Sequence, residues 1–181
     1  VLDFSQGHGG PYCTMHLGDA GAEIFKVEPP EGDWARGLGP PFVGGESAYF
    51  LALNRNKKSI VLNLKKPQGL EIALELAKGC DAVVEIFRPG VADKLGIGYK
   101  AIQNVNVKII YCSLSALDSE GPGKDLPGTE LTLQARGGVM RDLGEPDLAP
   151  VRFGEDGAAV ATGNYAAQAI VAALFHRIRT G

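Results

Sequence analysis

Short apolar runs alternate with stretches of helical spacing along most of the chain. Runs that are apolar throughout, or in which every second residue is apolar, are typical of strands, whereas apolar residues three or four apart indicate helices. On this basis we predict strands over residues 1–4, 22–28, 59–64, 81–87 and 108–113. We predict helices from Pro11 to about Gly18 and from Pro67 through Ala77, and a short helix that follows the turn at residues 88–90 and ends at Leu95. Further helices are predicted over residues 99–105, 129–139 and 158–178.

The alternation of strand and helix sets the expected fold. Strands that are apolar throughout are typical of a parallel sheet whose two faces are both covered. We therefore expect an α/β fold, with a Rossmann-like, mostly parallel sheet and helices on both faces. Ligands of such sheets bind beyond the carboxyl ends of the strands. Residues 31–47 are rich in glycine and proline, and we expect them to form a surface loop with Trp34 and Phe42 as apolar anchors.

The longest stretch without a charged residue runs from Gly157 to Phe175. Its length would suffice to cross a membrane, but it is dominated by alanine and contains Thr162, Asn164 and Gln168. We interpret it as a buried helix of a globular protein and expect no membrane contact.

Composition and charge narrow the function classes. The chain has 18 lysines and arginines against 21 acids, a net charge of −3, which provides no general attraction to nucleic acid. Its three cysteines and three histidines are scattered outside any spacing typical of a disulfide framework or a metal site. No secretory signal pattern is present. We expect a cytoplasmic protein without a metal that acts on a small molecule.

The first predicted strand is followed by a glycine loop that partly imitates a dinucleotide-binding fingerprint. Gly7 and Gly9 fit the pattern, and Glu28 lies about 20 residues further on, where an acid would bind a ribose. However, Tyr12 replaces the third glycine and Pro11 interrupts the turn. An NAD-binding oxidoreductase domain is therefore the weaker alternative, and we favour a tight strand-to-helix turn that simply needs glycine as the explanation of the loop.

Several longer strings carry a resemblance to a known family. They are Gly10-Pro11-Tyr12-Cys13-Thr14, Gly18-Asp19-Ala20-Gly21-Ala22-Glu23, Lys26-Val27-Glu28-Pro29-Pro30, Asn54-Arg55-Asn56-Lys57-Lys58-Ser59, Phe87-Arg88-Pro89-Gly90, Leu95-Gly96-Ile97-Gly98-Tyr99, Tyr111-Cys112-Ser113-Leu114-Ser115 and Gly121-Pro122. In this order and spacing they resemble the family III CoA-transferases. This CaiB/BaiF group includes carnitine-CoA transferase, formyl-CoA transferase and α-methylacyl-CoA racemase. The resemblance spans residues 1–181.

The resemblance implies an organisation larger than this chain. Family members have two linked domains per chain and form interlocked homodimers, with CoA on the larger, Rossmann-like domain. Residues 1–181 then correspond to the N-terminal part of that CoA-binding domain, and we expect the second domain to be absent from this sequence. The implied substrates are a CoA thioester and a small carboxylic acid.

The resemblance also implies where CoA would bind. Its phosphates need cations and backbone donors, its adenine a flat apolar slot, and its pantetheine arm a narrow groove. Lys65, Arg88 and Lys94 would meet phosphate, and Leu64 or Phe87 would border adenine. The full set of expected CoA-binding residues is Gly7, His8, Leu62, Leu64, Lys65, Ile86, Phe87, Arg88 and Lys94. Without the resemblance, we would favour solvated helix-end charges for Lys65 and Lys94, a surface ion-pair partner for Arg88 and a core position for Phe87.

The catalytic residue of the family is missing at its expected position. The transferases use an aspartate that attacks the acyl-CoA carbonyl and forms an anhydride. Counted back from Gly163, the matching position here is Ala159, whose methyl group cannot perform that chemistry. Asp156 and Glu155 lie shortly upstream and are substitute candidates. A carboxylate at the start of a helix is more often a charge that stabilises the helix dipole, and we favour that interpretation for both.

The racemase pattern is also incomplete. Racemases of this family pair a histidine with an aspartate as acid and base. Thr129 stands at the histidine position, directly before Glu130, and Ala159 again replaces the aspartate. We therefore predict a CoA-transferase-like, CoA-binding chain whose turnover is absent or depends on residues outside this sequence. A non-catalytic assembly module is a further alternative.

Overall fold

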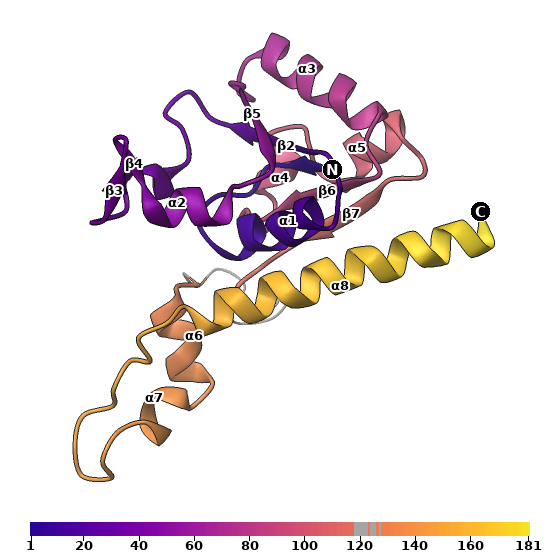
Figure 1. Ribbon diagram of the computed structural model, residues 1–181. Helices are drawn as coiled ribbons and strands as arrows, with labels where there is room; N and C mark the ends of the chain where they lie inside the picture. The colour runs from indigo at the N-terminus through magenta and orange to yellow at the C-terminus, as the bar shows by residue number, and fades with distance from the viewer. Residues whose placement is uncertain (118–122, 124–125, 127) are drawn as a thin grey trace.

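The computed structural model describes residues 1–117, 123, 126 and 128–181. Its centre is a sheet of five parallel strands in the order β5-β2-β1-β6-β7. These strands are β1 (Leu2–Asp3), β2 (Ile24–Glu28), β5 (Lys57–Val61), β6 (Ala82–Glu85) and β7 (Ile110–Ser113) (Figure 1). Each overlaps the segment predicted for it, and the expected α/β fold with a parallel sheet is confirmed.

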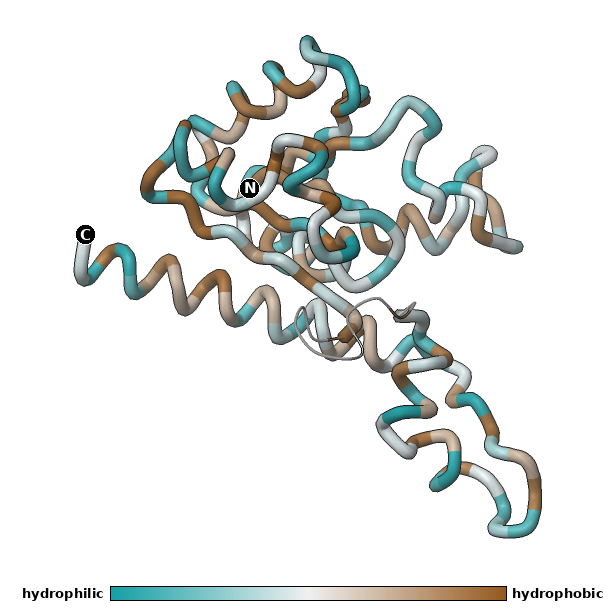
Figure 2. The backbone as a smooth tube through the Cα atoms, turned by 180° about the vertical axis from the view of Figure 1, so that it is seen from behind, coloured by the Kyte–Doolittle hydropathy of each residue, from teal (hydrophilic) through white to brown (hydrophobic). Residues whose placement is uncertain are grey.

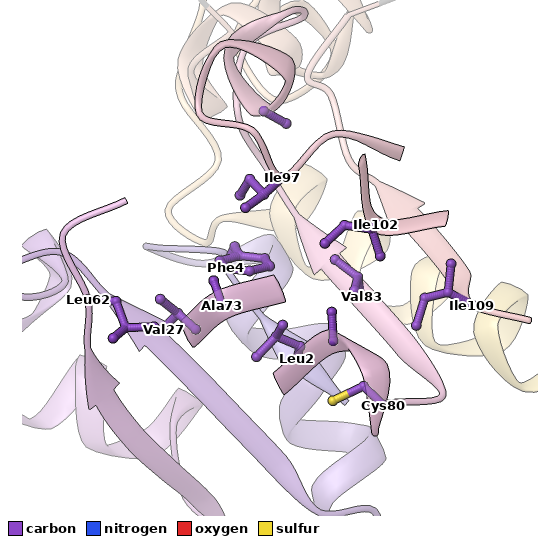
Figure 3. Packing of buried hydrophobic residues seen from close by; sticks show 12 residues of the cluster. Leu2, Phe4, Val27, Leu62, Ala73, Cys80, Val83, Ile97, Ile102 and Ile109 are labelled. Carbon is purple, nitrogen blue, oxygen red and sulfur yellow. The ribbon is translucent and has the colours of Figure 1, made fainter. Parts of the chain in front are cut away.

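Helices cover both faces of the sheet because the apolar side chains of its strands alternate between two cores. Val83 of β6 packs in a core with α3 (Pro67–Lys78), α4 (Val91–Lys94) and α5 (Tyr99–Val105). Figure 3 shows this core around Leu2, Phe4 and Val83. Its neighbours Ala82 and Val84 point the other way, toward α1 (Gly9–Asp19) and α8 (Gly157–Thr180).

The strand order reverses at β1, the centre of the sheet. The chain proceeds from β1 to β2 and β5 on one side, and then crosses to β6 and β7 on the other. At such a reversal the connections after two neighbouring strands leave toward opposite faces, which opens a crevice beyond the carboxyl ends. In this chain that crevice lies after β1 and β6.

The segment expected to be a loop is more ordered than its composition suggested. It contains a 3₁₀-helix η1 (Trp34–Gly37) and a hairpin of β3 (Phe42–Val43) and β4 (Glu46–Ser47), followed by α2 (Ala48–Leu53), which was not predicted. Trp34 and Phe42 are both more than half exposed. Their expected role as apolar anchors is therefore wrong, and the buried residues of the segment are Asp33, Ala35 and Ser47.

The predicted helix over 129–139 is divided into two. α6 (Glu130–Arg136) and α7 (Val139–Asp142) are separated by Gly138, whose φ of +79° suits glycine and ends the first helix. Thr129 caps α6, since its hydroxyl accepts a hydrogen bond from the backbone N–H of Thr132. The loop motif Gly121-Pro122 lies outside the described residues.

α8 is long and apolar enough, by length and composition alone, to cross a membrane. In the fold it lies along α1 and the sheet, and its buried residues are Gly163, Ala166, Ala167 and Ile170. Outside this stripe, the apolar residues Tyr165, Val171, Phe175 and Ile178 are all more than half exposed. Figure 2 shows apolar and polar positions mixed along this helix. The expected buried helix is thus buried along one stripe only, and the absence of a membrane contact stays a prediction.

Candidate functional site

Two adjoining cavities follow the carboxyl ends of the strands. The larger has a volume of about 610 Å³ and lies beyond β1, β6 and β7, at the crevice where the strand order reverses. The smaller, of about 230 Å³, lies beyond β1, β2 and β5. Gln6 and Phe87 line both cavities. The two cavities therefore lie side by side and share part of their lining.

Most of the residues expected to bind CoA line these cavities. The larger cavity is lined by His8, Ile86, Phe87 and Arg88. The smaller cavity is lined by Leu62, Leu64, Lys65 and again Phe87. Residues from three separate predicted segments are thus brought together at one edge of the sheet. Gly7 and Lys94 line neither cavity.

The three expected phosphate-binding cations are free to meet an anion. Lys65, Arg88 and Lys94 are exposed, and none forms an ion pair with an acid in the described part of the chain. Interpreting Arg88 as a surface ion-pair partner is therefore not supported among these residues. Arg88 lies in the wall of the larger cavity, whereas Lys65 lies in that of the smaller one.

Gly7 shapes the site through its backbone. Its φ is +79°, and a side chain at this position would collide with the ring of Trp34, which lines the larger cavity. Its N–H donates to Oδ1 of Asp33 at 3.1 Å, while Oδ2 of Asp33 lies 2.8 Å from Nζ of the buried Lys26. This buried ion pair ties the glycine loop to β2 and η1 and so fixes the backbone beside His8.

Glu28 does not serve as a ribose-binding acid. Its carboxylate is buried and accepts hydrogen bonds from Arg36, from the Ser59 hydroxyl and from the N–H of Asp33. Burial alone would raise the pKa of Glu28, but these donors, above all Arg36, lower it to about 2. With its oxygens occupied in this way, Glu28 offers nothing to a dinucleotide, which weakens the fingerprint interpretation of the glycine loop.

A histidine and a carboxylate meet in the wall of the larger cavity. Nδ1 of His8 lies 3.2 Å from Oδ2 of Asp156, and the Tyr49 hydroxyl donates to the same oxygen at 3.3 Å. The other oxygen, Oδ1, accepts from Arg152 at 2.8 Å. Burial, and then the charge of Asp156, raises the pKa of Tyr49, which keeps the phenol protonated as a donor. Asp156 is thus held from three sides.

The capping of α8 falls to Glu130 and not to Asp156. The two oxygens of Glu130 accept hydrogen bonds from the backbone N–H groups of Ala158 and Ala159, at 2.9 and 3.0 Å. Asp156 is the residue before the helix, yet its side chain makes no capping hydrogen bond. Glu130 therefore provides the hydrogen-bonded cap of α8, and the expectation that the charge of Asp156 stabilises the helix dipole stays a prediction. Glu155, the second substitute candidate, does not line the cavity.

Ala159, at the position where the family resemblance places the catalytic aspartate, lines the larger cavity. It lines the same wall as His8, Thr129 and Asp156. Its carbonyl oxygen would lie 3.3 Å from a Cβ placed on Gly9, so the first turns of α1 and α8 approach closely at this point. A carboxylate at position 159 would thus belong to the cavity wall, but alanine supplies only a methyl group.

Several residues of the cavity were not proposed as site residues from the sequence. Among them, Trp34 comes from a segment expected to be a loop, Tyr49 from a helix that was not expected, and Glu130 from the first turn of α6. The motif strings quoted above include none of them. Within the described residues no three metal-ligating side chains cluster, and the expected absence of a metal stays a prediction.

The sequence matches a known protein family along its whole length. The family described as CoA-transferase family III matches residues 1–181. The chain is 46% identical to succinyl-CoA:glutarate CoA-transferase of Mus musculus and 40% identical to acetyl-CoA:oxalate CoA-transferase of Acetobacter aceti. Each match covers the whole chain and 42% or 47%, respectively, of the relative.

A solved structure extends the similarity to three dimensions. The crystal structure of a CAIB/BAIF family protein from Brucella suis superimposes with a TM-score of 0.95 at 38% identity, over 99% of this chain and 49% of that one. This chain therefore spans about half the length of the relatives that it matches. Because the family match extends over the whole sequence, the chain belongs to CoA-transferase family III.

Proposed function

We propose that this chain binds CoA and its acyl thioesters in the two adjoining cavities, as the CoA-binding part of a family III CoA-transferase. The observation that carries the proposal is that Gln6 and Phe87 line both cavities, so that a smaller cavity lies directly beside a larger one. The smaller cavity suits the pantetheine arm, and the larger one suits the acyl group with its thioester. Family membership supports this assignment.

The positions of the cationic side chains support the same placement of the ligand, with its phosphates at the smaller cavity and its acyl group in the larger one. Lys65 lies in the wall of the smaller cavity, and Lys94 lies in α4, one residue before Leu95 in the same wall. The phosphates of CoA would therefore lie at this end, where cations without acid partners can bind them. Arg88, in the larger cavity, would face the carboxylate of a dicarboxylic acyl group or a phosphate.

The relatives suggest the class of acyl group. One is named for succinyl-CoA and glutarate, and another for acetyl-CoA and oxalate. Glutarate and oxalate are both small dicarboxylic acids. We propose a small dicarboxylic acid as the acyl group or as the acceptor, because Arg88 offers a guanidinium that can bind a second carboxylate.

Transfer of CoA to a carboxylic acid needs a nucleophilic carboxylate next to the thioester, whereas binding of the thioester does not. Ala159 occupies the position of the family's aspartate, and Glu130 is engaged by two backbone N–H groups. We therefore propose binding of CoA thioesters as the retained function and CoA transfer as a reaction that Ala159 prevents.

A cytoplasmic location and a homodimer that includes a second domain are proposed from the resemblance.

Calorimetric titration of the chain with CoA tests this proposal. A dissociation constant below about 1 mM is expected, because the phosphates at the nucleotide end and the pantetheine arm both find partners. NAD⁺ serves as the comparison ligand and should neither bind with similar affinity nor displace CoA. Absence of heat at millimolar CoA, or binding of NAD⁺ that CoA does not displace, would refute the proposal.

A further inference from the structure

His8 and Asp156 form a pair that the family pattern does not explain. The two residues lie 148 positions apart in sequence, and their contact is made where the start of α1 meets the start of α8. The side chain of His8 is 15% exposed and that of Asp156 is 28% exposed. Both residues line the larger cavity, so the pair lies in its wall and within reach of a ligand there.

The hydrogen bond decides which nitrogen of His8 is available. An ionised carboxylate only accepts hydrogen bonds, so Nδ1 of His8 carries the proton that faces Asp156. Nε2 of a neutral imidazole then has a free lone pair, and no hydrogen-bond partner for it is found in the described residues. Asp156 is itself fixed by Tyr49 and Arg152. The arrangement is that of a histidine base oriented by a carboxylate.

A donor for a developing negative charge lies next to this base. Gly9 follows His8 directly and is the first residue of α1, an 11-residue helix whose amino end carries partial positive charge. The backbone N–H of Gly9 has no acceptor in the described part of the chain, and Gly9 lines the same cavity. A thioester carbonyl placed there would have a hydrogen-bond donor for its oxygen.

We propose that the His8–Asp156 pair makes this chain an acyl-CoA hydrolase, a reaction that rests on the proposed binding of CoA thioesters. Nε2 of His8 takes a proton from a water molecule, whose oxygen attacks the thioester carbonyl carbon. The tetrahedral intermediate then collapses, the carbon–sulfur bond breaks, and the CoA thiolate takes the proton back from the imidazolium. The products are the free carboxylic acid and CoA, so no other reactant is needed.

Water is the reacting nucleophile because the carboxylates of the cavity are otherwise engaged. Ala159 has no carboxylate, and both carboxylate oxygens of Glu130 accept hydrogen bonds from backbone N–H groups. Both oxygens of Asp156 are bound to side-chain donors, which hold it as a positioning residue for His8. A small water molecule can reach the space beside the methyl group of Ala159.

Release of the CoA thiol from glutaryl-CoA, followed with a thiol-reactive chromophore and without any added carboxylic acid, tests the proposal. His8→Gln should lower kcat at least 100-fold with KM within about threefold, since a general base contributes on the order of 10²–10⁴. His176→Gln, an exposed histidine near the end of α8, is the matched control and should keep the original rate.

Asp156 is tested as the residue that orients His8. Asp156→Asn should lower kcat at least tenfold and leave KM nearly unchanged, and Asp156→Glu should recover part of the loss. Asp147→Asn, an exposed acid outside the cavity, is its matched control. Calorimetry with CoA on each variant shows whether the fold and the binding site are intact.

The outcomes separate this inference from the proposed function. If CoA binds but glutaryl-CoA is not hydrolysed, or if His8→Gln hydrolyses it as fast as the original chain, the hydrolase inference is wrong and the binding proposal stands. A covalent acyl group on Asp156, seen as an added mass on the intact protein during turnover, would also overturn direct attack by water. If CoA does not bind, both proposals fail.

Discussion

A Cβ placed on Gly163 would lie 2.7 Å from the carbonyl oxygen of Gly9 and 2.9 Å from the ring of Tyr12. α8 therefore rests directly on the first turn of α1, with no room for a side chain between them. This contact brings Asp156, at the start of α8, to His8, at the start of α1. The shape of the larger cavity thus depends on a glycine two turns away from the charged pair.

Gly163→Ala should force the two helices apart. Overpacking at such a contact costs about 2 kcal/mol, and the midpoint of urea denaturation should fall accordingly. Gly154→Ala is the control, because a Cβ there would meet no atom within 4 Å. Equal midpoints for the two variants would show that α1 and α8 do not meet as described.

Ala159→Asp should introduce CoA transfer. A carboxylate at this position would face a thioester in the larger cavity and could form the anhydride through which the family passes CoA to an acceptor. We expect formation of glutaryl-CoA from succinyl-CoA and glutarate at least tenfold above the original chain, measured by chromatography of the CoA esters. Ala158→Asp, one residue earlier and outside the cavity lining, is the control. Tight CoA binding without transfer would show that more than this carboxylate is missing.

Lys65→Gln should weaken binding of CoA, and Arg88→Gln should weaken binding of a dicarboxylic acyl-CoA such as glutaryl-CoA. A charge-assisted contact with phosphate or carboxylate contributes on the order of 1.4 kcal/mol, so each dissociation constant should rise about tenfold. The difference should shrink as salt is raised, because these side chains are exposed. Lys100→Gln in α5, outside both cavities, should leave the affinity unchanged. If all three variants bind alike, the cations do not meet the ligand.

Glu28→Gln should destabilise the chain in a pH-dependent way. Arg36 and the other donors keep the pKa of the buried Glu28 at about 2, below its ordinary 4.5. The stabilisation from this carboxylate is therefore complete above about pH 4.5 and is lost as the pH falls toward 2. At pH 7 we expect a loss of about 3 kcal/mol in the free energy of unfolding, and a much smaller loss at pH 3.

Urea denaturation at the two pH values measures this difference. Glu71→Gln, an exposed acid of α3, is the control and should change the free energy of unfolding little at either pH. A Glu28→Gln penalty that stays constant between pH 7 and pH 3 would contradict the assignment of the low pKa.

Much of the fold was predictable because its signals are local. Tyr99–Val105 forms α5 with the predicted bounds, and Pro67 opens α3 as its position suggested. α2 was missed because Ala48–Leu53 is apolar almost throughout and has no polar face to reveal a helical period. The break at Gly138 was missed because a single glycine does not show whether a helix tolerates it or ends there.

The site was predictable only in part. The CoA-binding candidates around Leu62 and Phe87 could be inferred from the family resemblance, because they follow predicted strands. The contact of His8 with Asp156 could not be inferred, because it joins residues 148 positions apart and depends on how α8 packs on α1. Likewise, Glu130 takes over the capping of α8 through a tertiary contact that no local sequence pattern indicates.

The location of CoA in crystals of this chain grown with the ligand tests the central claim most directly. We predict difference density for the pantetheine arm along Phe87 and Gln6, with the thiol in the larger cavity near His8 and the phosphates toward Lys65 and Lys94. Density for CoA elsewhere on the surface, with both cavities filled by water at saturating CoA, would contradict the account.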